Sequence, residues 1–236
     1  MMSTPPDLKG LSLRRPNTTA FGLLNRKLRW SLSWKGWLLA LVLVTGAACF
    51  FVWRIYPFLA VTDRQETDIL VVEGWIDRSA IQAAVKEFTN GSYQRVFTTG
   101  GPVHGSDGTN IYSTSASVGA GRLRAGGIPA DKVQMVPSFV RQRDRTYGAA
   151  LALRNHCRTN GLAIRRINVL TESVHARRSW FLFQKAFGDD AEVGIISVPN
   201  SEYDAAHWWR YSEGVKEIIS EGAGYLYVRL FFHPDD

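Results

Sequence analysis

The chain has 236 residues, 45% of them hydrophobic and 21% charged, which is the composition of a folded protein with one sizeable core. Its formal net charge of +7 is concentrated at one end, because seven basic residues and a single acidic residue lie within the first 35 positions. The remainder is nearly neutral and offers no basic face for DNA or RNA, so we expect no nucleic-acid partner.

A long apolar stretch follows the basic tail. Gly36 to Trp53 is an uncharged run of 18 residues. As a helix this run would be about 27 Å long, close to the thickness of the hydrocarbon layer of a membrane. We predict a transmembrane helix over residues 36–56, in which Trp37, Trp53 and Tyr56 would anchor the ends at the membrane surfaces.

The position of the basic residues predicts the orientation of this helix. The basic tail, residues 1–35, is expected to stay in the cytoplasm, which leaves residues 63–236 as a domain outside the cytoplasm. A lipoprotein cleavage site before Cys49 is an alternative, but Gly46 stands where such sites carry a large aliphatic residue.

Short β-branched runs alternate with helical stretches after the apolar segment. Each run is apolar throughout, as buried parallel strands are. Five strands are predicted, at residues 68–72, 95–99, 133–136, 167–171 and 193–198. Strand and helix in regular alternation predict an α/β fold, namely a Rossmann-like, doubly wound and mainly parallel five-stranded sheet after one transmembrane helix.

Apolar side chains at helical spacing mark the helices between these strands. The sets are Ile81, Val85 and Phe88; Ala150, Leu153 and Cys157; and Trp180, Phe183 and Phe187. A last helix, about Ser212 to Leu230, carries Val215, Ile219, Gly222, Leu226 and Leu230 on one face. Glycines near 91, 126 and 188 are predicted to end the helices that precede them.

Four segments are expected to meet where a ligand would bind. In parallel α/β sheets, ligands bind outside the carboxyl ends of the strands. The segments at those ends are 73–75, 98–101, 141–146 and 171–178. The second opens a loop that is rich in glycine as far as Gly108, whose backbone N–H groups could approach an anion; a plain surface turn is the alternative.

Arginines accumulate at two predicted helix starts. Arg141, Arg143 and Arg145 precede Thr146, a plausible N-cap. Arg177 and Arg178 lie in the first turn of the next helix. Basic residues are unfavourable near a helix N-terminus unless an anion offsets them. We therefore expect a phosphate or carboxylate ligand, with pairing to nearby acids as the alternative.

His175 stands at the junction of a strand and a helix, where it could act as a general acid or base or simply be structural. The other histidines show no metal spacing, and we expect no metal and no cofactor. The predicted ligand-binding residues are Glu73, Gly74, Thr99, Gly100, Gly101, Arg145, Thr146, Thr171, Ser173 and Arg178, with His175 as the catalytic candidate.

The motifs together resemble a known family. Thr-Thr-Gly-Gly after the second strand, Thr146 in the third crossover helix, and Thr171, Ser173, His175 and Arg178 in the pattern T-x-S-x-H-x-x-R are similar to the YdcF/SanA/ElyC-like family. The resemblance covers about residues 68–230. It implies a Rossmann-like domain, often held by an N-terminal membrane helix and linked to cell-envelope construction and barrier function in bacteria.

Two positions depart from that family. Gly148-Ala149-Ala150 follows Tyr147, where the family commonly has Glu-Asn-Ala, and Ser113-Thr114-Ser115 stands in place of Ser-Glu-Ala. Two acidic or amide groups are therefore missing.

The leading hypothesis from the sequence is a bacterial inner-membrane protein, spanning the membrane once, whose outer domain binds an anionic envelope metabolite or lipid-linked precursor. A hydrolase or transferase using His175 is one form of this hypothesis. A non-catalytic scaffold in envelope assembly is the alternative.

Overall fold

The computed structural model of this chain describes residues 18–19, 24–26, 30–105, 110–141 and 144–234. The chain divides into two compact units, Met1–Trp53 and Arg54–Asp236. Each unit is described by itself below.

In the part of the first unit that the structure describes, three short strands precede most of one long helix. Strands β1 (Thr18–Thr19), β2 (Leu24–Arg26) and β3 (Trp30–Leu32) form a small antiparallel sheet within the basic tail, which the charge pattern did not predict. Helix α1 (Trp34–Leu59) follows, starting two residues before and ending three residues after the predicted span. By its length and composition α1 is long and apolar enough to cross a membrane, and its apolar stretch is not buried.

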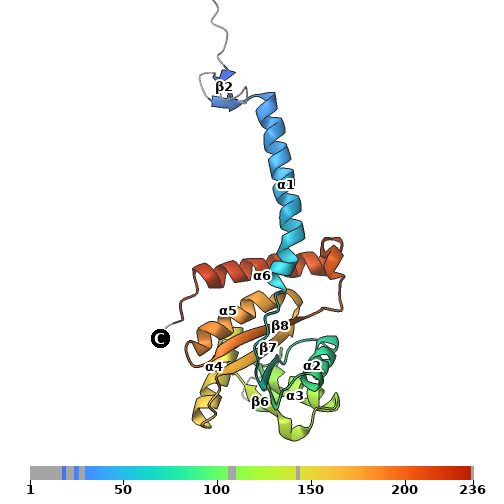
Figure 1. The fold of residues 1–236 in the computed structure, drawn as a ribbon, viewed down its shortest axis with the longest axis vertical. Helices are drawn as coiled ribbons and strands as arrows, with labels where there is room; N and C mark the ends of the chain where they lie inside the picture. The colour runs from blue at the N-terminus through green and yellow to red at the C-terminus, as the bar shows by residue number, and fades with distance from the viewer. Residues whose placement is uncertain (1–17, 20–23, 27–29, 106–109, 142–143, 235–236) are drawn as a thin grey trace, which may run out of the picture. The chain divides into compact units, whose positions relative to one another are not determined.

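The second unit is built on a five-stranded sheet in which every strand is parallel (Figure 1). The strands are β4 (Ile69–Glu73), β5 (Arg95–Gly100), β6 (Val133–Pro137), β7 (Arg166–Glu172) and β8 (Glu192–Val198), in the order β6-β5-β4-β7-β8. All five predicted strands are confirmed, with ends that differ by one residue at most.

Helices cover both faces of this sheet because successive strand residues point to opposite sides. Val71 packs with α4 (Arg145–Thr159) and α5 (Ala176–Phe187) on one face. Its neighbours Leu70 and Val72 pack with α2 (Arg78–Asn90) and α3 (Ser115–Ala125) on the other. The predicted apolar positions of α2, α4 and α5 face these cores, and Gly91, Gly126 and Gly188 follow their helices as predicted.

Short 3₁₀ turns connect several of these elements. They are η1 (Ile111–Ser113), η2 (Ala130–Lys132), η3 (Ser173–His175) and η4 (Ala205–Arg210). The third of them lies directly between β7 and α5, so it places His175 at the carboxyl end of a central strand.

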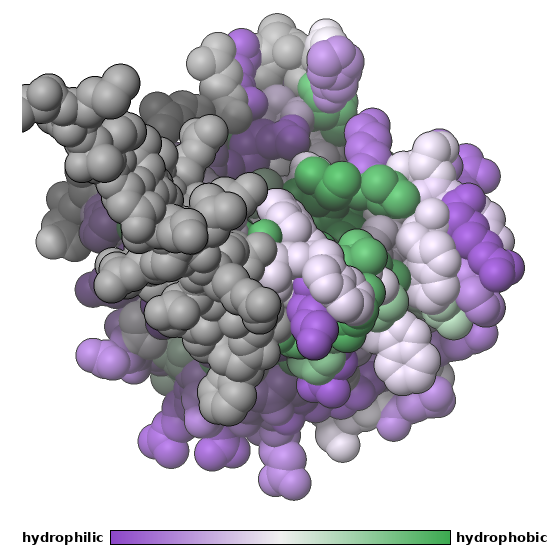
Figure 2. All heavy atoms as spheres, turned by 90° about the horizontal axis from the view of Figure 1, so that it is seen from above, coloured by the Kyte–Doolittle hydropathy of each residue, from purple (hydrophilic) through white to green (hydrophobic). Residues whose placement is uncertain are grey.

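The last helix, α6 (Ser212–Leu230), has the predicted bounds and packs against α5. Its buried residues are Gly214, Ile218, Glu221 and Val228, whereas the apolar residues Ile219, Leu226 and Leu230 are exposed. Figure 2 shows hydrophobic residues, in green, beside the grey atoms and hydrophilic residues, in purple, along much of the outline. The apolar stripe read from the sequence therefore exists, but it faces away from the core.

Candidate functional site

A cavity of about 420 Å³ opens at the carboxyl edge of the sheet. Its floor is formed by the ends of β4 and β5, and η3, α3, α4, α5 and α6 contribute the remaining walls. Eight of the predicted site residues line it, namely Glu73, Thr99, Gly100, Gly101, Arg145, Thr146, His175 and Arg178. Four segments that lie far apart in the sequence therefore meet at one edge of the sheet, as parallel topology requires.

Two glycines allow α3 to begin close against this edge. A Cβ added to Gly74 would lie 2.1 Å from the carbonyl oxygen of Ser115, and one added to Gly100 would lie 2.7 Å from the Ser115 side chain. Gly100 also has a φ of +151°, which side chains disfavour. Gly74 does not line the cavity, so its contribution is to let the N-terminus of α3 reach it.

The N-terminus of α4 opens on the same cavity. Asp144, in the left-handed conformation with a φ of 56°, is the N-cap, and its side chain caps no N–H group. Thr146 is therefore in the first helical turn and is not the N-cap that the sequence pattern predicted. Both Arg145 and Thr146 line the cavity beside these uncapped groups.

Arg145 is the basic side chain of the cavity that has not been neutralised. Among the residues that the structure describes, no acid forms an ion pair with it. Of the other two arginines of that cluster, Arg141 is exposed outside the cavity, and Arg143 lies outside the described residues. Thr99, 1% exposed, adds a hydroxyl without a hydrogen-bond partner to the same wall.

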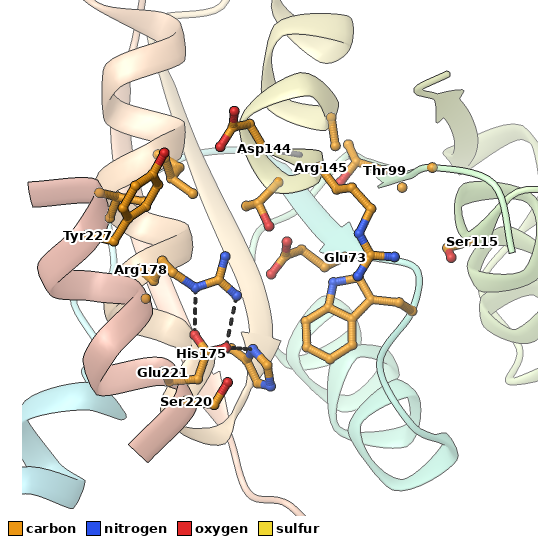
Figure 3. A pocket seen from close by; sticks show the side chains of 18 of the residues that line it. Glu73, Thr99, Ser115, Asp144, Arg145, His175, Arg178, Ser220, Glu221 and Tyr227 are labelled. Atoms are coloured by element: carbon orange, nitrogen blue, oxygen red, sulfur yellow. Dashed lines mark hydrogen bonds and ion pairs between the residues drawn. The ribbon is translucent and has the colours of Figure 1, made fainter. Parts of the chain in front are cut away.

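Glu221 of α6 binds two of the predicted site residues on the opposite side of the cavity (Figure 3). Arg178 donates two hydrogen bonds to it, Nε to Oε2 at 2.7 Å and Nη2 to Oε1 at 2.9 Å. His175 Nδ1 lies 3.1 Å from Glu221 Oε1, within ion-pair range although its N–H direction misses hydrogen-bond geometry. The ring of His175 also meets that of Trp75, with centroids 4.6 Å apart.

These contacts change the pKa values of Glu221 and His175. Burial disfavours the Glu221 carboxylate, but the interactions with His175 and Arg178 outweigh burial and hold its pKa at about 2. Burial likewise disfavours charged His175, yet Glu221 raises the pKa of the imidazole above its ordinary value. His175 therefore keeps its second ring proton to a higher pH than a free imidazole would, while the pairing with Glu221 leaves Nε2 as the ring nitrogen available to a ligand.

A second carboxylate, Glu73, lies at the end of β4 and is 2% exposed. It accepts a hydrogen bond from Ser179 Oγ at 2.8 Å. In Figure 3, Arg145 enters the cavity from one side and Arg178 from the other. The cavity therefore presents both acidic and basic groups, among them Glu73, which was on the predicted list, and Glu221, which was not.

Arg177 points away from this cavity. Its guanidinium lies over the ring of Phe58, 4.2 Å from the centroid, and its Nε donates a hydrogen bond to the Phe58 carbonyl oxygen. The hypothesis that Arg177 and Arg178 face one anion together is thus wrong for Arg177. Adjacent residues on a helix point about 100° apart, so only one of them could reach the cavity.

Thr171 and Ser173 do not line the cavity, and both are completely buried at the end of β7. The Ser173 hydroxyl is 3.1 Å from the hydroxyls of both Tyr56 and Tyr203. Ser173 therefore connects the last turns of α1 to the segment that follows β8, and its φ of 48° is a strained conformation.

Glu221 is the most consequential residue that the sequence reading missed. Its neighbours on the buried side of α6 are two apolar residues and a glycine, which give a weaker helical signal than the exposed stripe. Ser220, Gly224, Tyr227 and Val228 of the same helix also line the cavity. Comparison with protein-family models, with curated proteins and with solved structures finds no match to this chain.

Proposed function

We propose that this chain is a membrane-anchored protein whose α/β unit binds a phosphate- or carboxylate-bearing metabolite in the cavity at the carboxyl edge of the sheet. The observation that carries the proposal is Arg145, a cation without an acidic partner among the described residues, beside the uncapped start of α4. An anion there would satisfy both the guanidinium and the helix N–H groups.

Three further features of the cavity support an anionic ligand. The start of α3 lies against Gly100, and the unpartnered Thr99 hydroxyl is a free donor on the same side. On the opposite side, Glu221 is already neutralised by Arg178 and His175, so it does not repel the ligand. We therefore expect the anionic group to bind on the side of Arg145 and the rest of the ligand to lie toward His175.

The position of the cavity fits a Rossmann-like, doubly wound sheet. The first strand of the unit, β4, is central, and the chain adds β5 and β6 on one side before β7 and β8 on the other. Ligands of such sheets bind where the order reverses, here between the ends of β4 and β7. Glu73 is the last residue of the first of these strands, and His175 follows the second.

Hydrolysis or group transfer is the second candidate function, favoured by the pairing of His175 with Glu221. A carboxylate that holds one ring nitrogen leaves the other free to exchange a proton with a bound molecule. With its pKa raised, His175 is suited to donate a proton to a leaving group while Arg145 holds the anionic group.

The membrane part of the proposal is supported by α1 and by the distribution of charge. The basic residues before α1 favour a cytoplasmic N-terminus and an α/β unit on the outer side of a bacterial inner membrane. The resemblance to the YdcF/SanA/ElyC-like family leads to the same location and to a role in envelope biogenesis, with non-catalytic scaffolding as the remaining alternative.

The test is binding of defined anions to the full chain in detergent or nanodiscs. Inorganic phosphate, sugar phosphates, nucleotides and polyprenyl phosphates would be screened by thermal shift, and affinities would be measured by calorimetry. Arg145→Ala should weaken binding by about tenfold or more, since hydrogen bonds to charged groups contribute about 1.5–3 kcal/mol. Arg141→Ala, an exposed arginine four residues earlier and outside the cavity, is the matched control.

Two results would overturn the proposal: no anion in the screen binds, or both arginine variants bind as the wild type does. Catalysis is tested separately. If the bound compound is turned over, His175→Gln should abolish turnover and retain binding; unchanged turnover in this variant would exclude His175 as the acid or base.

A further inference from the structure

Helix α6 carries a stripe of large aliphatic side chains that the core does not cover. Ile219, Leu226 and Leu230 are 66%, 57% and 60% exposed. At 100° per residue, these three positions lie within roughly 40° of one another around the helix. The side chains of Glu221 and Val228, which are buried, point almost the opposite way. A soluble domain seldom leaves such a continuous stripe in water.

Aromatic residues continue this surface at the start of the helix. Trp209 and Tyr211, just before α6, are each 40% exposed. Rings of this kind, with an apolar body and one polar atom, are common where proteins meet the surface of a membrane.

The same helix lies beside the point where the chain leaves the apolar segment. The ring of Phe58, near the end of α1, contacts that of Tyr225, with centroids 5.5 Å apart. The guanidinium of Arg177 lies over the same Phe58 ring, and the Tyr56 hydroxyl contacts the Ser173 hydroxyl. All of these contacts lie within the second unit, so the end of α1 is fixed next to α6.

We propose that α6 is an interfacial helix, which lies in the surface of the bilayer with Ile219, Leu226 and Leu230 inserted among the lipids. The inference rests on the proposed membrane anchor, because an anchor that ends at Phe58 holds Tyr225 and the rest of α6 at the membrane surface. An amphipathic helix in this position buries its apolar face in the boundary between headgroups and acyl chains.

Apolar rather than electrostatic interactions hold α6 at the bilayer. Lys216 and Arg229 are balanced by Glu213 and Glu217 along α6, while Glu221 is paired within the unit. Helix α6 therefore has no net positive charge that would attract anionic lipids. A neutral phosphatidylcholine bilayer should be sufficient for its insertion.

Docking of α6 has a consequence for the cavity. The buried side of the helix supplies Glu221, Gly224 and Val228 to the cavity wall, while the opposite side meets the lipids. A helix with side chains is about 10 Å across, so the cavity would lie about one helix diameter from the headgroups. Such a position favours an anionic substrate that remains embedded in the membrane by a lipid tail.

The test is the depth of spin labels on the full chain in phosphatidylcholine nanodiscs. In a Cys49→Ala background, single cysteines would replace Ile219, Leu226, Glu213 or Val44. The remaining thiol, Cys157, is buried and its pKa is raised to about 11, so it reacts slowly. Collisions with oxygen report the bilayer interior, and collisions with a water-soluble nickel chelate report the aqueous phase.

Labels at Ile219 and Leu226 should give an oxygen-to-nickel ratio several-fold higher than the label at Glu213 and lower than the label at Val44, near the middle of α1. A ratio at Leu226 equal to that at Glu213 would overturn the inference while leaving the anchor intact. Protection of the stripe labels from both reagents would also overturn it, because it indicates a protein covering. Nickel access at Val44 would refute the anchor and this inference together, whereas anion binding is measured independently.

Discussion

At the scale of single residues, the site is organised around one buried carboxylate. Glu221 holds the guanidinium of Arg178 in a bidentate pair and the imidazole of His175 at 3.1 Å. Removal of one member of a buried ion pair leaves the other charged and desolvated, which costs far more than the loss of an exposed pair. The same carboxylate thus determines both the stability of this edge and the charge of His175.

Replacement of Glu221 by glutamine should lower the free energy of unfolding by about 3–5 kcal/mol, because Arg178 remains buried without its counter-charge. Denaturant titration of the full chain in detergent at neutral pH would measure this loss. Glu192→Gln is the matched control, since the Arg166–Glu192 pair is exposed, at 50% and 63%, and should contribute about 1 kcal/mol or less. Equal losses in the two variants would contradict the prediction.

The pH dependence of stability checks the same interaction. A carboxylate whose pKa is lowered from 4.5 to about 2 contributes stability that is complete above pH 4.5 and is lost as the pH falls toward 2. The wild type should therefore lose stability over this interval, and Glu221→Gln should lack that part of the acid dependence.

The sequence predicted which residues lie at the strand ends better than it predicted which way their side chains point. His175, Arg178 and Arg145 were expected at the strand ends and do line the cavity, because parallel topology places those ends together. Arg177, one position away, instead covers Phe58. Which of two adjacent arginines faces a ligand depends on the rotation of α5 against its neighbours, and the spacing of charges does not encode that rotation.

At the scale of elements, the strands were predicted well because each is a short apolar run buried on both faces. For helix α6, the apolar pattern did not predict which side packs on the unit. Its strongest apolar periodicity marks the exposed side, whereas the side that packs on the unit carries Gly214 and Glu221. Periodicity indicates that an apolar face is shielded from water. It does not distinguish whether a protein core or a lipid bilayer shields it.

The contact between the end of β4 and the start of α3 leads to a second stability prediction. Gly74→Ala should destabilise the unit by about 1–3 kcal/mol, because its Cβ would lie 2.1 Å from the Ser115 carbonyl oxygen and push α3 outward. Gly121→Ala, a change within α3, is the control. No atom lies within 4 Å of its added Cβ, so this change should stabilise α3 by up to about 1 kcal/mol.

Thermal unfolding of the two glycine variants, in the same detergent, would measure the difference. A melting temperature of Gly74→Ala at or above that of the wild type would show that α3 does not need this close approach. Because the start of α3 lines the cavity through Ser115, the destabilised variant should also bind the anionic ligand more weakly.

At the scale of the whole molecule, the chain is divided by charge as well as by structure. The basic tail precedes a helix that is long and apolar enough to cross a membrane, and a nearly neutral α/β unit follows. Positive charge next to a membrane helix is retained in the cytoplasm, so the asymmetry predicts on which side each part lies.

Reaction of single cysteines with a membrane-impermeant maleimide would test this orientation. In a Cys49→Ala background expressed in bacteria, Lys86→Cys on the exposed side of α2 should react in intact spheroplasts. Ser31→Cys, exposed just before α1, should react only after lysis. Replacement of the seven basic residues of the tail by glutamine should make both sites partly reactive, since the charge that fixes the orientation is then gone. Reaction of Ser31→Cys in intact spheroplasts carrying the native tail would reverse the assignment and place the cavity in the cytoplasm, where its ligand would have to be a cytoplasmic anion.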